Sequence, residues 1–346
     1  MKEDWISIVE SAYELSGSDE HWLKSLAEVA RPALDCGLGL VGYFYNASAA
    51  RLKLYGYIRA GASPDLIEFA RRVHEHPAWR SSELLRATYR SSTALTYSSD
   101  MGKEQWEEML ASTGDWGENG PRRVLILHAS DPSNIGCVLG APDPRATSSP
   151  LTRKAPWTRI AAHLVAGLRL RRRLAGQGSR SEAEEAILSP SGTLLHAEGP
   201  AKTRTARDGL RAATVAIEKA RGRLRRADPD AALNLWRGLL DGRWSLIDRV
   251  EHDGRRLIVA HRNNVATRGL RALTFRERQV AAYAALGHSN KLIAYELGLS
   301  LGSVGTHLTS ALAKLGAKSR LELIQIAASL GAPGSSADKR DTSLGR

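Results

Sequence analysis

The residues best suited to bind another molecule lie near the end of the chain, on one face of a predicted helix that starts after Ser300. At 100° per residue, one stripe of this segment is apolar and the opposite stripe carries small and polar side chains. The apolar stripe consists of Val304, Leu308, Ala311, Leu312 and Leu315, and the opposite stripe of Gly302, Thr306, Thr309, Ser310 and Ala313. Small polar side chains suit the major groove of DNA, where base edges offer hydrogen-bond donors and acceptors. The pattern therefore predicts a helix that docks onto DNA.

Other short helices must hold this helix in place. Thr274 and Glu277 have the spacing of a capping box, which predicts a helix start, and Gly298 provides the positive φ of a tight turn. A second capping box at Ser319 and Glu322 predicts a further helix. These signals predict a compact module of four helices.

Five short motifs follow one another in this module. They read LTxRERxV, GxSNKxIA, LxxS, SVxxH and KLGAxSR, and they begin at Leu273, Gly287, Leu297, Ser303 and Lys314. Together they resemble the LuxR-type helix-turn-helix domain of transcriptional regulators. The resemblance implies an all-α domain of four helices, in which the third helix reads the major groove and the fourth pairs two copies into a dimer.

The resemblance also implies which residues contact DNA. Asn290 and Lys291 match positions that hold the DNA backbone. Ser303 and His307 match positions that flank the groove, while the positions between and after them often contact bases. The predicted DNA-binding residues are Asn290, Lys291, Ser303, Gly305, Thr306, His307, Thr309 and Ser310. The alternatives are a solvated lysine at 291, a packed histidine at 307 and threonines that face only solvent.

Gly305 departs from the family pattern, which often has a lysine there. A glycine costs a helix interior up to about 1 kcal/mol relative to alanine, and it also leaves the groove-facing surface without a cation. This departure motivates an alternative function, a protein-interaction or signalling module with a degenerate helix-turn-helix.

Two enzyme motifs occur in the wrong structural context. Residues 37–42 match G-x-G-x-x-G, but a strand is predicted after the motif, where a dinucleotide site needs a helix. Residues 298–302 match G-x-S-x-G, but a helix is predicted before it and Ser300 is explained as an N-cap. His74 and His76 lie two positions apart on a predicted helix, so they point to different sides and do not form a metal pair. We therefore expect no catalytic residue, no metal and no cofactor, and we expect that the protein is not an enzyme.

The upstream chain reads as two α+β units. A helix over residues 1 to about 30, hairpins at 37–60 and 122–142 and a long helix at 152–174 resemble a GAF-type sensor domain. Hairpins at 186–199 and 244–263 enclose helices and resemble a PAS-like fold, which follows a linker at 176–182. The predicted fold class is an α+β sensor region with antiparallel sheets and helices, followed by the all-α four-helix module. The predicted domains are GAF-like at 1–175, PAS-like at 183–265 and LuxR-type at 270–332, with a disordered tail at 333–346.

Charge and cysteine content agree with a regulator in the cytoplasm. The net charge of +12 is concentrated: residues 153–180 hold eight basic side chains and no acid, and residues 202–226 hold nine against two acids. This suits either a polyanion partner or a solvated helix face. Cys36 and Cys137 lie in apolar runs and are expected to be buried thiols. No apolar run approaches the roughly 20 residues that span a bilayer.

The sequence as a whole predicts a DNA-binding transcriptional regulator in which an N-terminal sensory region controls the C-terminal helix-turn-helix. The expected partners are double-stranded DNA, a second copy of the chain and an effector, which is a small molecule or a protein. No membrane is expected as a partner. The control mechanism we expect is a shift in dimer geometry that changes the spacing of two recognition helices.

Overall fold

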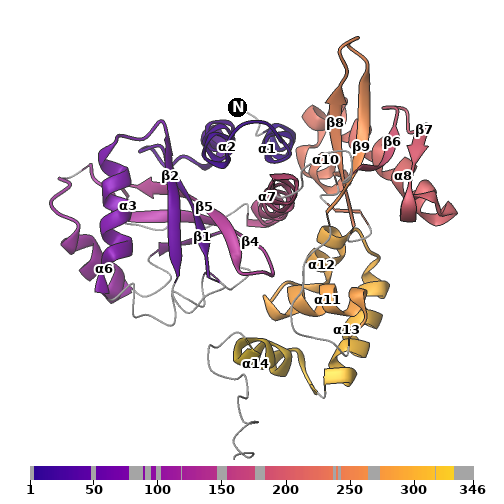
Figure 1. Ribbon diagram of the computed structural model, residues 1–346. Coiled ribbons are helices and arrows are strands. Elements are labelled where there is room, and N and C mark those ends of the chain that lie inside the picture. Colours follow the sequence, from indigo (N-terminus) through magenta and orange to yellow (C-terminus); the bar gives the residue numbers. More distant parts are fainter. Residues whose placement is uncertain are drawn as a thin grey trace, which may run out of the picture.

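The computed structural model describes residues 4–47, 52–77, 89, 95–98, 103–117, 119–145, 154–175, 184–236, 239–240, 243–263, 273–315 and 317–330. The predicted linker at 176–182 and the predicted tail at 333–346 lie outside these ranges. Two antiparallel sheets with helices precede a group of C-terminal helices (Figure 1), which confirms the predicted fold class.

The first sheet has the strand order β2-β1-β5-β4-β3, and every neighbouring pair is antiparallel. Its strands are β1 (Leu40–Asn46), β2 (Lys53–Ala60), β3 (Leu95–Tyr97), β4 (Arg123–Ser130) and β5 (Ile135–Asp143). Side chains from one face join a cluster with α1 (Trp5–Ala12), α2 (Asp19–Leu34) and α7 (Lys154–Ala175). Side chains from the other face join α3 (Asp65–Glu75) and α6 (Lys103–Ser112). Because both faces are covered, β1 is a continuous apolar run rather than an alternating one.

The second sheet has the order β7-β6-β9-β8 and is also antiparallel. It consists of β6 (Glu184–Leu188), β7 (Leu194–Ala197), β8 (Trp244–Val250) and β9 (Arg256–Arg262). The helical part between its two hairpins comprises the 3₁₀ turn Gly199–Lys202 and the helices α8 (Arg204–Arg221), α9 (Leu224–Ala227) and α10 (Pro229–Leu235). Both predicted hairpins are confirmed.

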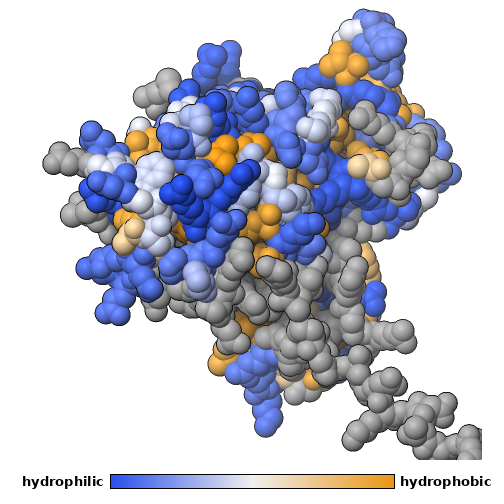
Figure 2. Space-filling view, turned by 60° about the vertical axis from the view of Figure 1, so that its left-hand side comes forward, coloured by the Kyte–Doolittle hydropathy of each residue, from blue (hydrophilic) through white to orange (hydrophobic). Residues whose placement is uncertain are grey.

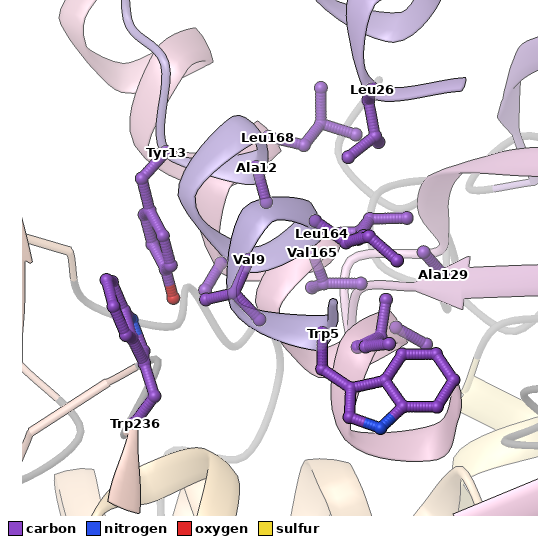
Figure 3. Packing of buried hydrophobic residues seen from close by; sticks show 14 of the residues in the cluster. Trp5, Val9, Ala12, Tyr13, Leu26, Ala129, Leu164, Val165, Leu168 and Trp236 are labelled. Carbon is purple, nitrogen blue, oxygen red and sulfur yellow. The ribbon is translucent and has the colours of Figure 1, made fainter. Parts of the chain in front are cut away.

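A single buried cluster connects the two sheets. It runs from Trp5 and Val9 in α1 through Leu164 and Leu168 in α7 to Trp236 after α10 (Figure 3). Helix α1 crosses α7 so closely that a Cβ on Gly167 would collide with the carbonyl oxygen of Ala12. The first and second sheets are therefore joined by packed helices.

The N-terminal segment differs from the predicted single helix over residues 1–30. Helix α1 ends at Ala12, and α2 begins only at Asp19. Gly17 adopts a φ of +71°, and the hydroxyl of Ser18 accepts a hydrogen bond from the amide of His21. A residue in the left-handed region followed by an N-cap restarts the helix in a new direction.

The surface seen in Figure 2 is mostly hydrophilic, with apolar residues in small patches. None of the helices in the described ranges has the length and apolar character needed to cross a membrane.

Candidate functional site

The C-terminal module contains the four predicted helices α11 (Phe275–Ala285), α12 (Asn290–Leu297), α13 (Leu301–Leu315) and α14 (Arg320–Leu330). The first capping box is present, since the Glu277 amide donates to Thr274 Oγ1 and Glu277 Oε2 accepts from the Thr274 amide at 2.7 Å. Gly298 closes α12 with a φ of +65°, as the tight turn before α13 requires. The predicted scaffold is thus confirmed.

Glu277 also fixes the orientation of α13. Its side chain is only 6% exposed, and its two oxygens accept hydrogen bonds from Lys314 Nζ at 2.8 Å, while Oε1 accepts from Ser310 Oγ at 2.6 Å. The Lys314 ammonium, followed by the Ser310 hydroxyl, lowers the pKa of Glu277 to about 2. One carboxylate therefore caps α11 and holds α13 against it.

The outer face of α13 presents most of the predicted groove residues. Thr306 and Thr309 are exposed, and Ser303, Gly305 and His307 are half-buried. Thr306 Oγ1 donates to the carbonyl of Gly302 at 3.1 Å, which is a bond that a hydroxyl can exchange for a base or a water molecule. Lys291, at the start of α12, is also exposed. These residues form the surface that we call the groove face: Lys291, Ser303, Gly305, Thr306, His307 and Thr309.

Two predicted contact residues are engaged inside the module instead. Ser310 is turned toward Glu277, and the Asn290 side-chain oxygen accepts a hydrogen bond from Arg320 Nη1 at 3.0 Å. Arg320 additionally donates to the carbonyl of His288. The tertiary structure thus uses both side chains to fasten helices, although the Asn290 amide nitrogen still has donors to offer.

The groove face carries little positive charge. The sequence from 301 to 313 contains no lysine or arginine, and Lys314 is paired with Glu277. A Cβ on Gly305 would meet no atom within 4 Å, so the glycine leaves open space where a longer side chain would fit. Lys291 at the start of α12 and Lys318 after α13 are both exposed.

The second capping box is only half present. The Ser319 hydroxyl accepts from the Glu322 amide at 3.2 Å, as predicted. The Glu322 carboxylate accepts from the amide of Lys318 at 2.6 Å rather than from that of Ser319. The predicted start of α14 is correct, but the amide that donates to the Glu322 carboxylate belongs to the residue before the predicted one.

The module contacts helix α7 through a buried chain of hydrogen bonds. His163 in α7 is 0% exposed, with Nδ1 at 3.1 Å from Tyr13 Oη and Nε2 at 2.6 Å from Tyr295 Oη. Tyr295 belongs to α12, and its hydroxyl points at the carbonyl oxygens of Leu233 and Trp236 at 3.0 and 2.9 Å. Because the only hydroxyl proton of Tyr295 is directed to a carbonyl, His163 Nε2 is the donor to Tyr295 and Nδ1 accepts from Tyr13. Burial lowers the pKa of His163 to about 3, so the ring is neutral.

A second contact lies further along α7. Arg169 donates to Asp131 Oδ2 at 2.7 Å and to Tyr283 Oη in α11 at 3.1 Å. Asp131 follows β4 directly, next to Ser130, which accepts a hydrogen bond from Tyr45 Oη. Arg169 therefore links the residue after β4 to the C-terminal module, and the neighbouring Ser130 is bound to Tyr45 of β1.

Many of the clustered basic side chains are engaged inside the protein. Four arginines of the two basic stretches form ion pairs with acids from distant parts of the chain. These pairs are Arg169–Asp131, Arg171–Asp19, Arg221–Glu10 and Arg225–Asp4. Other basic residues on α8, such as Arg204 and Arg207, remain exposed. The sequence pattern suggested a polyanion partner or a solvated helix face. The structure shows a further role for four of these arginines, which is to hold α1, α2 and the first sheet against the rest of the chain.

A pocket opens between the first sheet and helices α3 and α6. Its empty volume, including the part open to solvent, is about 480 Å³. The lining is mostly apolar, with Val41, Leu66, Phe69, Val73, Trp106 and Ile126 among the contributors. An apolar lining with few polar groups is typical of small-molecule sites.

The polar groups of the pocket are few and uncharged. Ser98 Oγ accepts from the Val124 amide at 2.9 Å and retains its own proton for donation. His74 Nδ1 lies 2.9 Å from Tyr57 Oη, and burial followed by the charge of His128 lowers the pKa of His74 to about 3. A charged ligand would lose hydration here without gaining a counter-ion, so the pocket fits an uncharged molecule.

Cys137 is fully buried, as predicted, and Cys36 is only partly buried. Among the residues that the structure describes, no three histidine, cysteine, aspartate or glutamate side chains are grouped so that they could hold a metal ion.

The sequence patterns did not predict the hydrogen bonds by which Tyr295, Tyr283 and Arg320 hold the C-terminal helices. The two tyrosines carry a weak signal, since each places a hydroxyl on the otherwise apolar side of a predicted helix. Their hydrogen-bond partners, His163 and Arg169, lie more than 100 residues away in α7.

The C-terminal module matches a known protein family. Residues 271–327 match the family described as bacterial regulatory proteins, luxR family. No curated protein matches the chain. A crystal structure of SdiA from Escherichia coli is 11% identical with a TM-score of 0.34, covering 94% of this chain and 97% of that one. SdiA in complex with octanoyl-rac-glycerol is 12% identical with a TM-score of 0.30, covering 94% and 93% of the two chains.

Proposed function

We propose that this chain, whose residues 271–327 form a luxR-family domain, is a transcription regulator that binds double-stranded DNA and is not an enzyme. The observation that carries the proposal is the groove face on α13, held at a fixed orientation by Glu277. Lys291 and the amide of Asn290 would contact the DNA backbone. Ser303, Gly305, Thr306, His307 and Thr309 would enter the major groove, where the exposed hydroxyls of Thr306 and Thr309 would contact base edges, that of Thr306 in exchange for its bond to Gly302. Ser310 acts behind this face by orienting α13.

Affinity in this proposal rests more on phosphates than on bases. The absence of lysine and arginine from 301–313 leaves hydroxyl and imidazole groups as the readers of sequence. Two copies of the domain, paired through α14, would double the number of contacts and read two half-sites. Such a regulator acts in the cytoplasm, where its DNA lies.

We further propose that residues 1–175 and 183–265 form a GAF-like and a PAS-like unit, and that the first of them senses an uncharged, mostly apolar small molecule. The pocket beneath α3 and α6 supports a ligand site, and the network Tyr45–Ser130 and Asp131–Arg169–Tyr283 supports a connection to α11. A ligand that shifts the strands would move Asp131, and with it Arg169 and the contact to the DNA-binding module.

The decisive experiment selects duplexes that bind the full-length protein from a random pool. The expected result is an enriched, two-fold symmetric sequence whose affinity falls steeply with salt. Lys291→Ala should weaken binding to all sequences, whereas Thr306→Val should change the preferred base at one position. Lys219→Ala, an exposed lysine on α8, is the matched control for charge.

The alternative, a protein-interaction or signalling module with a degenerate helix-turn-helix, is favoured by the absence of lysine and arginine from residues 301–313. It predicts no enriched sequence and no effect of Lys291→Ala on DNA binding. That outcome would replace the proposal.

A further inference from the structure

Two arginines bind one buried carboxylate at an end of the second sheet, and a third arginine lies within electrostatic range of it. Arg243, which directly precedes β8, donates to both oxygens of Glu185 at 2.9 and 2.7 Å. Arg262, at the end of β9, donates to Oε1 of the same carboxylate. Arg173 lies in the last turn of α7. Glu185 itself is buried, with 3% of its surface exposed.

Glu185 has no acceptor capacity left for Arg173. Its Oε2 accepts from Arg243 and from the indole nitrogen of Trp244 at 2.7 Å, and its Oε1 accepts from Arg243 and Arg262. A carboxylate oxygen offers about two lone-pair sites, so both oxygens are saturated. Burial opposes ionisation of Glu185, but these hydrogen bonds outweigh it and lower the pKa. The carboxylate is therefore charged and fully used.

Arg173 is an unpaired cation next to this cluster. Its Nε is enclosed and has no hydrogen-bond partner within the described part of the chain, and no ion pair is formed there by its other nitrogens. Burial, followed by the charges of Arg262 and Arg243, lowers the pKa of Arg173, and Glu185 compensates only in part. Among the residues that the structure describes, Arg173, Arg243 and Arg262 thus bring three positive charges near the one negative charge of Glu185. The carbonyl groups at the C-terminus of α7 offset roughly half a charge.

We propose that Arg173, Arg243 and Arg262 bind a small oxyanion of the phosphate class. Guanidinium groups form paired hydrogen bonds with such oxyanions, and a dianion balances the two excess charges. The free donors are those of Arg173 and the terminal nitrogens of the other two arginines that Glu185 does not occupy. This site is separate from the apolar pocket, which suits an uncharged molecule, and it does not depend on the DNA-binding proposal.

Because of its position, an anion bound at this site would also affect the contacts of α7 with the DNA-binding module. Arg173 is one helical turn beyond Arg169, which holds Tyr283 of α11. Asn263, which follows Arg262, donates from its side chain to the carbonyl of Ala166 and to Ser245 Oγ. An anion that draws Arg173 and Arg262 together would tighten this joint between α7 and the second sheet.

The test uses the full-length protein and inorganic phosphate, titrated against chloride at constant ionic strength. The expected result is a saturable rise in Tm and a saturable binding isotherm by calorimetry, with Arg173→Gln reducing affinity at least tenfold. Arg172→Gln is the matched control, because the neighbouring Arg172 is paired with Tyr55 instead. In chloride alone, Arg173→Gln should leave the Tm unchanged or raise it, since it removes an unpaired cation; a fall in Tm would mark Arg173 as structural and overturn the proposal.

Two further outcomes would also overturn the proposal. One is a phosphate effect that is absent, or equal in the wild type, Arg173→Gln and Arg172→Gln proteins. The other is failure of inorganic phosphate to bind while Arg173→Gln lowers the salt dependence of duplex DNA binding. In that case the arginines contact the DNA backbone rather than a small anion, and the function as a DNA-binding protein stands.

Discussion

His163 in α7 and Tyr295 in α12 share a hydrogen bond of 2.6 Å that joins the upstream region to the DNA-binding module. The bond is the middle link of a chain from Tyr13 in α1 to the carbonyls of Leu233 and Trp236. The Arg159 guanidinium lies 5.9 Å from the centre of the Tyr295 ring, and Leu239 packs into the core of the C-terminal helices. Helix α7 and the segment at the end of α10 therefore both contact α12.

Tyr295→Phe should loosen this contact without changing the fold of the module. The ring and its packing stay, but the His163 Nε2–H and the two carbonyls lose their shared hydroxyl. Leaving buried polar groups unsatisfied costs about 1–3 kcal/mol each. We expect faster hydrogen exchange in α12 and a lower Tm of the full-length protein. Tyr55→Phe, which removes a part-exposed hydroxyl, is the control, and equal protection of α12 in both variants would contradict the prediction.

Gly305→Lys should strengthen DNA binding. The position lies on the groove face with open space around it, and the new side chain adds a cation and removes the helix penalty of glycine. The slope of log K against log salt should steepen by about one unit. Gly305→Gln separates the two effects, because it should raise helix stability by up to about 1 kcal/mol without changing the slope. If both variants bind DNA alike, α13 does not enter the major groove as proposed.

Glu277→Gln should remove an acid-sensitive part of the stability. The carboxylate has a pKa of about 2 in the folded protein and an ordinary value near 4.5 when unfolded. A depressed pKa contributes stability above pH 4.5, and this contribution is lost as the pH falls toward 2. The difference in unfolding free energy between wild type and variant should therefore shrink over that interval. Carboxyl ¹³C NMR gives an independent check, and Lys314→Met should move the pKa of Glu277 back toward 4.5.

Ala70→Phe should close the apolar pocket. Ala70 lines the pocket from α3, and a benzyl group would occupy part of its volume. We expect the variant to fold with a loss of about 1–3 kcal/mol from overpacking, and to lose binding of a neutral apolar fluorescent dye that the wild type binds. Arg71→Gln, at the next position on the same helix, should bind the dye normally. Retained binding in Ala70→Phe would place the dye elsewhere on the protein.

The parts of the molecule that could be predicted from sequence are those held by contacts between residues that lie close together in the chain. The Thr274–Glu277 capping box, the turn at Gly298 and the hairpins depend on contacts within a few residues, so their sequence patterns predicted them. The five ordered motifs from Leu273 to Arg320 were likewise sufficient for the DNA-binding module, because its scaffold residues lie at fixed spacings.

The tertiary structure alone decided which polar residues face outward. Ser310 lies on the predicted groove stripe, yet Glu277 turns it inward; Asn290 is fastened by Arg320. Whether a charge is free depends on acids that lie far away in the sequence, as for Arg171 and Asp19 or Arg225 and Asp4. No local pattern encodes these pairs, because each forms only when separate helices pack together. For the same physical reason, the sequence determined that this chain carries a DNA-binding module, and only the packing of α7 against α12 decided how that module is held.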